Sequence, residues 1–134
     1  MKRILFLLTV FIYFTGTVWG ETVYTISDIN GCRYDSINNS YNHDTDKILK
    51  GIFIITDKGR RATIAFIKDG EVKQKTEAVS MPFQDGISFI EIYPAAIWMY
   101  TVFPQQKIAY LTSHRTTLGK ATSLNLHGKL TYKP

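Results

Sequence analysis

Short runs of β-forming residues, most of them closed by a turn signal, fill the chain from residue 47 to the C-terminus and constrain its fold more than any other feature. Isoleucine, valine, threonine and aromatic residues are frequent in these runs. Such punctuation is typical of strands and hairpins, and no stretch of ten or more residues has the spacing of an amphipathic helix. The predicted strands are 22–26, 47–57, 61–68, 71–79, 87–93, 97–103, 107–113 and 123–132.

The regular spacing of these strands predicts an all-β fold, a small antiparallel meander β-barrel of about eight strands. The meander is favoured because most connections are short enough for sequence neighbours to pair. Closure would also remove the exposed strand edges of a small apolar sheet. A β-sandwich is the alternative that the sequence leaves open.

Single glycines place a tight turn and an interrupted strand. Asp69-Gly70 separates two runs and predicts a type I′ hairpin turn, because this dipeptide readily adopts positive φ angles. In the last run, Gly128 interrupts a face formed by Leu124, Leu126, Leu130 and Tyr132. A lone glycine within a strand often marks a bulge or a close backbone approach, so we expect one of these here.

The first twenty residues have the layout of an export signal. Lys2 and Arg3 precede an apolar run over 4–14, and Val18 and Gly20 suit a signal peptidase that cleaves after Gly20. An uncleaved anchor or a buried core helix is the alternative, but the run is shorter than the roughly 20 apolar residues that cross a bilayer. We therefore expect a signal peptide at 1–20 and a single domain at 21–134, periplasmic or secreted, with membrane contact only through the signal before cleavage.

The charge and cysteine content narrow the class of protein further. The chain has 16 basic and 11 acidic residues, and loss of the signal lowers its net charge from +5 to +3. The basic residues form scattered pairs, so no nucleic-acid partner is expected. Cys32 is the only cysteine, so the domain has no internal disulfide. Cys32 is therefore a buried small side chain, an intermolecular partner or a reactive thiol.

A long polar segment at 28–46 predicts a loop that touches any functional site, because loops of this length in compact domains are usually functional or mobile. Within it, His43, Asp44 and Asp46 are candidate metal ligands, since such side chains can converge when a loop curls. The EF-hand order of ligands is absent, and a polar loop capped by Asx turns explains the same residues. No cofactor is therefore predicted.

Two further histidines offer candidate catalytic groups. If the last two strands pair, His114 and His127 could face one another, and with Cys32 they would form a thiol–imidazole site. The alternative is that both histidines face solvent. Lipase-type, zinc-protease and phosphate-loop motifs and the CxxC motif are all absent from the sequence, which argues against an enzyme without excluding one.

The strand at 97–103 is apolar on both faces and supplies the candidate binding residues. Trp98 and Tyr100 share one face, and Ile97, Met99 and Phe103 share the other. In a barrel one face fills the core, and the other is covered by the polar loop or by a partner. Tyrosine and tryptophan commonly anchor interfaces, so we expect Trp98 and Tyr100, with Tyr34 and Tyr41 from the loop, to bind a ligand or partner.

Three functional hypotheses follow. The favoured one is a binding module for an unidentified protein or small apolar ligand. A small metal- or histidine-dependent hydrolase or nuclease is the second, and a structural envelope component is the third. In outline the chain is similar to small periplasmic barrels such as the lysozyme inhibitors, but it lacks their serine-glycine-tyrosine loop and cysteine pair, so no family is assigned.

Overall fold

The computed structural model describes residues 20–36, 40–42 and 51–134, so residues 1–19 of the signal expected at 1–20 lie outside the described part. Within these ranges no helix is long and apolar enough to cross a membrane. The strands are β1 (Thr22–Asp35), β2 (Ser40–Asn42), β3 (Ile52–Asp57), β4 (Arg61–Lys68), β5 (Glu71–Phe83), β6 (Gly86–Tyr93), β7 (Ala96–Phe103), β8 (Ile108–Thr117) and β9 (Lys120–Lys133).

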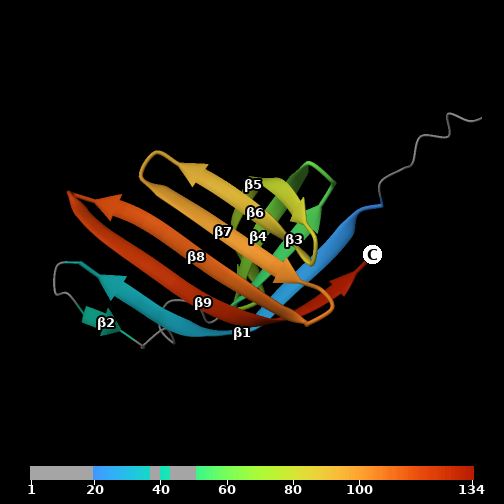
Figure 1. Ribbon diagram of the computed structural model, residues 1–134, viewed down its shortest axis with the longest axis horizontal. Coiled ribbons are helices and arrows are strands. Elements are labelled where there is room, and N and C mark those ends of the chain that lie inside the picture. Colours follow the sequence, from blue (N-terminus) through green and yellow to red (C-terminus); the bar gives the residue numbers. More distant parts are fainter. Residues whose placement is uncertain (1–19, 37–39, 43–50) are drawn as a thin grey trace, which may run out of the picture.

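Eight of these strands close into an antiparallel meander barrel (Figure 1). From β3 to β9 each strand pairs with its neighbour in sequence, β1 pairs with β3, and β9 closes the barrel on β1. The short strand β2 pairs with the end of β1 outside this ring. The prediction of an all-β meander barrel is confirmed, and the sandwich alternative is excluded.

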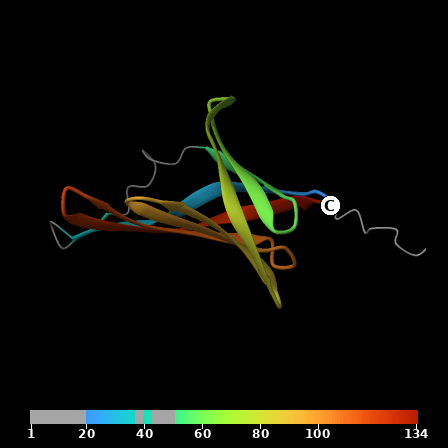
Figure 2. The same cartoon turned by 90° about the horizontal axis from the view of Figure 1, so that it is seen from above.

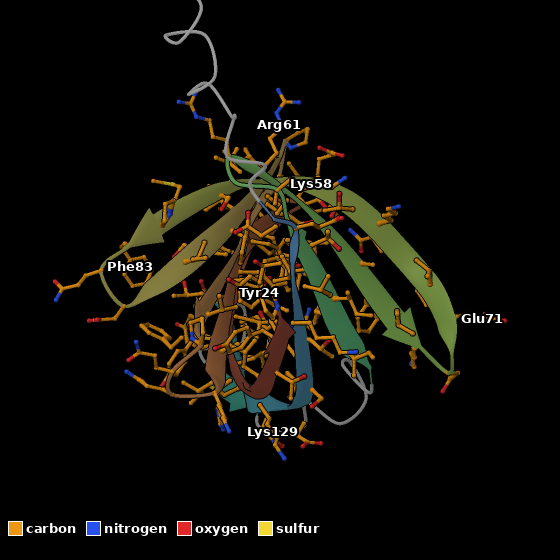
Figure 3. All side chains as sticks on the ribbon, turned by 90° about the vertical axis from the view of Figure 1, so that its right-hand side faces the viewer. Tyr24, Lys58, Arg61, Glu71, Phe83 and Lys129 are labelled. Atoms are coloured by element: carbon orange, nitrogen blue, oxygen red, sulfur yellow. The ribbon has the colours of Figure 1, made fainter. Side chains whose placement is uncertain are left out.

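Strand β5 passes from one side of the barrel to the other. Its first part, Glu71 to Ala78, pairs only with β4, whereas the ladder to β6 begins at Val79 and runs to Phe83. Figure 2 shows β5 crossing the molecule steeply relative to β7, β8 and β9. Its two ends, marked by Glu71 and Phe83, lie on opposite flanks in Figure 3. The first part of β5 is therefore an edge.

The space enclosed by the strands is filled with side chains, Tyr24 among them (Figure 3). The alternating pattern of each strand sends one set of side chains inward, where large apolar groups dominate. Aromatic contacts link different strands, including Phe53 with Tyr100 at 5.2 Å and Tyr24 with Phe89 at 5.8 Å between ring centroids. The largest fully buried side chains are Phe89, Ile26, Ile55, Leu111, Leu130 and Val102. Burial of this apolar surface, without a disulfide, stabilises the barrel.

The predicted loop at 28–46 is wrong over its first part, because β1 continues to Asp35. The long strand β9 offers a ladder along this whole length, and its pairing with β1 resumes at Asn30 after an irregularity that follows Ser27. Asp28 has a φ of 51° within this irregularity. The local turn signals therefore mark a β-bulge, and tertiary pairing outweighs the polar composition of the segment.

A second difference concerns the predicted strand at 71–79, which is longer in the structure. Strand β5 continues through Pro82 to Phe83, and only Gln84 and Asp85 form the turn to β6. Beyond Val79 the ladder to β4 has ended, so this part of β5 lies at an edge. Proline is tolerated at an edge because its missing N–H removes no ladder hydrogen bond there.

Both glycine predictions are confirmed. Asp69 and Gly70 have φ angles of 55° and 77°, as a type I′ turn requires. At Gly128, an added Cβ would lie 2.7 Å from Ile26 Cγ2 and 2.9 Å from the Ser27 carbonyl oxygen. Gly128 therefore permits a close approach of β9 to β1 beside the bulge.

Candidate functional site

An apolar patch covers the outer face of β5, β6, β7 and β8. Of the ten large apolar side chains that are exposed in the described ranges, seven lie on this face. Ile92 is 74% exposed and Ile97 48% exposed, and these two residues are direct cross-strand partners. The patch, called the outer patch below, consists of Val79, Met81, Phe83, Ile92, Ile97, Met99 and Tyr110.

Aromatic contacts extend along the outer patch. The rings of Phe83 and Phe103 meet edge to face with centroids 5.8 Å apart, and Phe103 meets Tyr110 at 6.0 Å. The polar residues between the apolar side chains include Ser88 and Thr101, which hydrogen-bond to each other at 2.9 Å. A patch of this kind, apolar, aromatic and with few charges, has the composition of a protein interface core.

A shallow pocket of about 410 Å³ lies at one end of the outer patch. Ile92 and Ile97 line it on the patch side, and Tyr34 and His114 line it on the far side. These residues belong to one cross-strand row, in which Ile97 pairs with His114, and Ser123 pairs with both His114 and Tyr34. The pocket is therefore continuous with the patch and large enough to take side chains of a partner.

The opposite face of β7 points into the barrel. Tyr100 is 3% exposed, and Trp98 packs against the core with its ring stacked on Tyr100 at 6.2 Å between centroids. The predicted binding pair Trp98 and Tyr100 therefore lies inside the barrel, and the apolar face that solvent reaches is that of Ile97 and Met99. A ligand-binding role for Trp98 and Tyr100 stays a prediction.

A buried carboxyl group lies beside this aromatic pair. Glu91 is 3% exposed, and its carboxylate accepts hydrogen bonds from the hydroxyl groups of Tyr100, at 3.0 Å, and of Thr76. Burial raises the pKa of Glu91, and hydrogen bonds with Tyr100 and Tyr93 oppose that rise. Burial, with the negative charge of Glu91 nearby, also raises the pKa of Tyr100. Glu91 thus joins β5, β6 and β7 where the β5–β6 ladder has ended.

The inner face becomes polar toward one end of the barrel. Strand register places Glu91, Trp98, Ser113, Leu124 and Arg33 in one inner row. The next row toward that end contains Tyr93, Ala96, Arg115, Thr122 and Asp35. A small pocket of about 60 Å³ lies between the two rows and is lined by Arg33, Trp98, Ser113, Arg115, Thr122, Ser123 and Leu124. This is called the arginine pocket below.

The remaining candidate residues are placed as follows. Cys32 is partly exposed and pairs with Asn125, and its reactivity stays a prediction. His114 and His127 are both exposed, but His127 pairs with Tyr110 rather than with His114. His127 lies four residues along β9 from Ser123, the partner of His114, about 13 Å at the usual strand rise. The two histidines therefore do not face one another.

The proposed metal ligands His43, Asp44 and Asp46 lie outside the described residues, and the side chain of Tyr41 is likewise outside them. Within the described ranges, no group of three or more His, Cys, Asp or Glu side chains could hold a metal ion. The metal-site hypothesis at 43–46 stays a prediction.

Sequence reasoning missed the outer patch as a whole and the arginine pocket. The first had a signal, because Ile97, Met99 and Phe103 had been recognised as the second apolar face of the strand at 97–103. Arg33 and Arg115 had none, since they are 82 positions apart and only the pairing of β9 with both β1 and β8 brings them to one pocket.

Comparison with known proteins gives no relative: no family model, curated protein or solved structure matches this chain.

Proposed function

We propose that the protein is an exported binding module that holds a protein partner on the outer patch. The observation that carries the proposal is the gathering of seven exposed apolar side chains on one sheet face. The core does not need these seven side chains, because the inner faces of the same strands already supply it. Exposed patches of this kind mark interaction sites, and a partner that covers this one would gain the free energy of apolar burial.

The packed interior favours a surface-bound partner over an enclosed apolar ligand. Phe53, Phe66, Tyr100 and Trp98 fill the middle of the barrel, and the pocket between the inner rows measures about 60 Å³. A larger pocket of about 680 Å³ lies between the β3–β4 connection and β5, but its lining includes the charged side chains of Lys58 and Arg60, which do not suit an apolar ligand. Drug-sized ligands occupy pockets of about 300–1,000 Å³. The pocket of about 410 Å³ at the end of the outer patch reaches that range, and its place beside Ile92 and Ile97 suits an anchoring side chain of a protein.

The test is partner capture from the exported fraction of the source cells, with wild-type protein and two variants as bait. Ile97→Asp places a charge in the outer patch, and Leu118→Asp places one on the β8–β9 turn, where Leu118 is 95% exposed. We expect the same partner on wild-type and Leu118→Asp baits and at least a tenfold loss on Ile97→Asp. All three should unfold at similar temperatures, because both sites are on the surface.

Equal capture by the three baits would contradict the proposal. Analytical ultracentrifugation and co-sedimentation with phospholipid vesicles assign the patch to other occupants. If the wild-type protein forms a dimer that Ile97→Asp abolishes, the occupant of the outer patch is a second copy of the chain. If the wild-type protein binds vesicles and Ile97→Asp does not, the occupant is a lipid surface. The hydrolase and structural-component hypotheses gain no support from the described residues.

A further inference from the structure

The arginine pocket brings two cations together on the inner face of the sheet. Arg33 on β1 pairs with Leu124 on β9, and Arg115 on β8 pairs with Thr122 on the same strand. The two arginines thus lie two strands apart, about 10 Å across the sheet, and in neighbouring rows, two residues apart along the strand direction. Their side chains are long enough to bridge much of this distance, and both line the same pocket of about 60 Å³.

No carboxylate within the described ranges forms an ion pair with either guanidinium. Glu91 lies at the other end of the Arg33 row, and its carboxylate accepts from Thr76 and Tyr100. Asp35 lies two residues from Arg33 on the same face of β1 and in the row of Arg115, with Thr122 between Asp35 and Arg115, and it does not line the pocket. Two like charges that line one pocket repel each other, and an anion between them would replace this repulsion by attraction.

The other walls of the pocket supply hydrogen-bond donors and a flat apolar surface. The Nε–H of Arg115 donates to Thr122 Oγ1 at 3.2 Å, which orients the guanidinium plane. Ser113, 3% exposed, adds a hydroxyl group, and Trp98 adds an indole ring. Guanidinium groups bind carboxylates and phosphates through paired N–H donors, so this set of groups matches an oxyanion.

We propose that the arginine pocket binds an oxyanionic group, a carboxylate or a phosphate, with any planar apolar portion of the ligand against Trp98. The volume of about 60 Å³ is that of roughly two water molecules, so only the charged head enters and the rest of the ligand lies toward the open end. This site is on the inner face of the sheet that carries the outer patch. Arg115, Thr122 and Ser123 also line the pocket at the end of the outer patch, so the two pockets adjoin, whereas Arg33, Trp98 and Ser113 line the arginine pocket alone.

Thermal unfolding with added anions tests the proposal, because a ligand that binds only the folded state raises the unfolding temperature. The probes are sodium phosphate, acetate and benzoate, each compared with sodium chloride at equal ionic strength. A short peptide with a free C-terminal carboxylate, compared with its amidated form, tests whether a polypeptide can supply the anion. We expect saturable stabilisation by at least one oxyanion and no saturable effect of chloride.

Three variants locate the binding. Arg33→Gln and Arg115→Gln should each weaken the affinity about tenfold to a hundredfold, the usual loss for a charge-assisted hydrogen bond. Arg60→Gln, which removes an exposed arginine in the β3–β4 connection, should leave the affinity unchanged. Trp98→Leu should weaken benzoate more than phosphate. Each variant is first unfolded without anion, so that a loss of folding is separated from a loss of binding.

If no oxyanion raises the unfolding temperature at 50 mM, the proposal is overturned, because a dissociation constant above about 50 mM is too weak to count as a binding site. Equal losses in Arg60→Gln and Arg115→Gln also overturn it, because they would show general screening of surface charge. Because Ile97 and Arg115 line one pocket, the variant that distinguishes this site from the outer patch is Met81→Asp, which should lose the protein partner and keep oxyanion binding.

Discussion

The two faces of β7 have nearly the same composition but opposite roles. On the inner face Tyr100 and Val102 are buried among the core residues, whereas Ile97 and Met99 on the outer face remain exposed. The free energy of folding therefore depends mainly on the inner face. The exposed face contributes little to folding and retains apolar surface for a partner, which is why the two faces should respond differently to substitution.

The largest expected difference between the faces comes from truncation. Phe89→Ala on the inner face of β6 should lower the free energy of unfolding by about 3–5 kcal/mol, because Phe89 is fully buried and a cavity would remain. Ile97→Ala on the outer face should lower it by about 0.5 kcal/mol or less. Urea denaturation of both variants measures the two values. Similar losses would show that the outer patch is part of the core.

Addition of a methyl group sharpens the same comparison on β9. Gly128→Ala should lower the free energy of unfolding by about 1–3 kcal/mol, because the new Cβ would overlap Ile26 and the Ser27 carbonyl oxygen. His127→Ala, one residue away and facing outward, is the matched control and should be nearly neutral. An unchanged midpoint for Gly128→Ala would mean that β1 and β9 can separate at the bulge without loss of stability.

The smallest effect at any one pH is expected from Glu91→Gln. Burial raises the folded-state pKa of Glu91 above its ordinary value of 4.5, so folding favours the protonated form. This contribution to stability is fully present below pH 4.5 and is lost as the pH rises through the folded-state pKa. The variant lacks this loss, so its stability relative to wild type should increase with pH.

Urea denaturation from pH 4 to pH 8 measures this dependence. Ile92→Gln, the outward-facing neighbour, should show the same pH dependence as the wild-type protein. If the free energies of unfolding of Glu91→Gln and of the wild-type protein differ by the same amount at every pH, then Glu91 has the same pKa in the folded and unfolded states.

Local chemistry made several elements predictable. The Asp69-Gly70 turn depends on the φ preferences of two adjacent residues, and the strand runs depend on an alternation that each segment carries by itself. The β1 extension and the strand through Pro82 were not predictable in this way. The β1 extension depends on pairing with β9, which overrides the turn preferences of Asp28 and Gly31. The strand through Pro82 depends on pairing with β6 where no β4 ladder lies on its other side.

The candidate sites divide along the same line. Tyr34 was predicted to bind and lines the pocket at the end of the outer patch, but nothing in its own segment indicated which residues would join it. Trp98 and Tyr100 were recognised as binding candidates from residue type, which does not distinguish an interface residue from a core residue. Their inward orientation follows from the register of β7 with β6 and β8.

The sequence by itself determined the strand class, the meander order and several turns, the Asp69-Gly70 turn among them, because these depend on preferences and spacings within a few residues. Tertiary structure alone decided which face of each strand became the interior, where the outer patch lies, and that Arg33 and Arg115 share a pocket. The physical reason is that the register between strands distant in sequence is chosen by the packing of the whole core, and a shift of one residue would exchange the two faces.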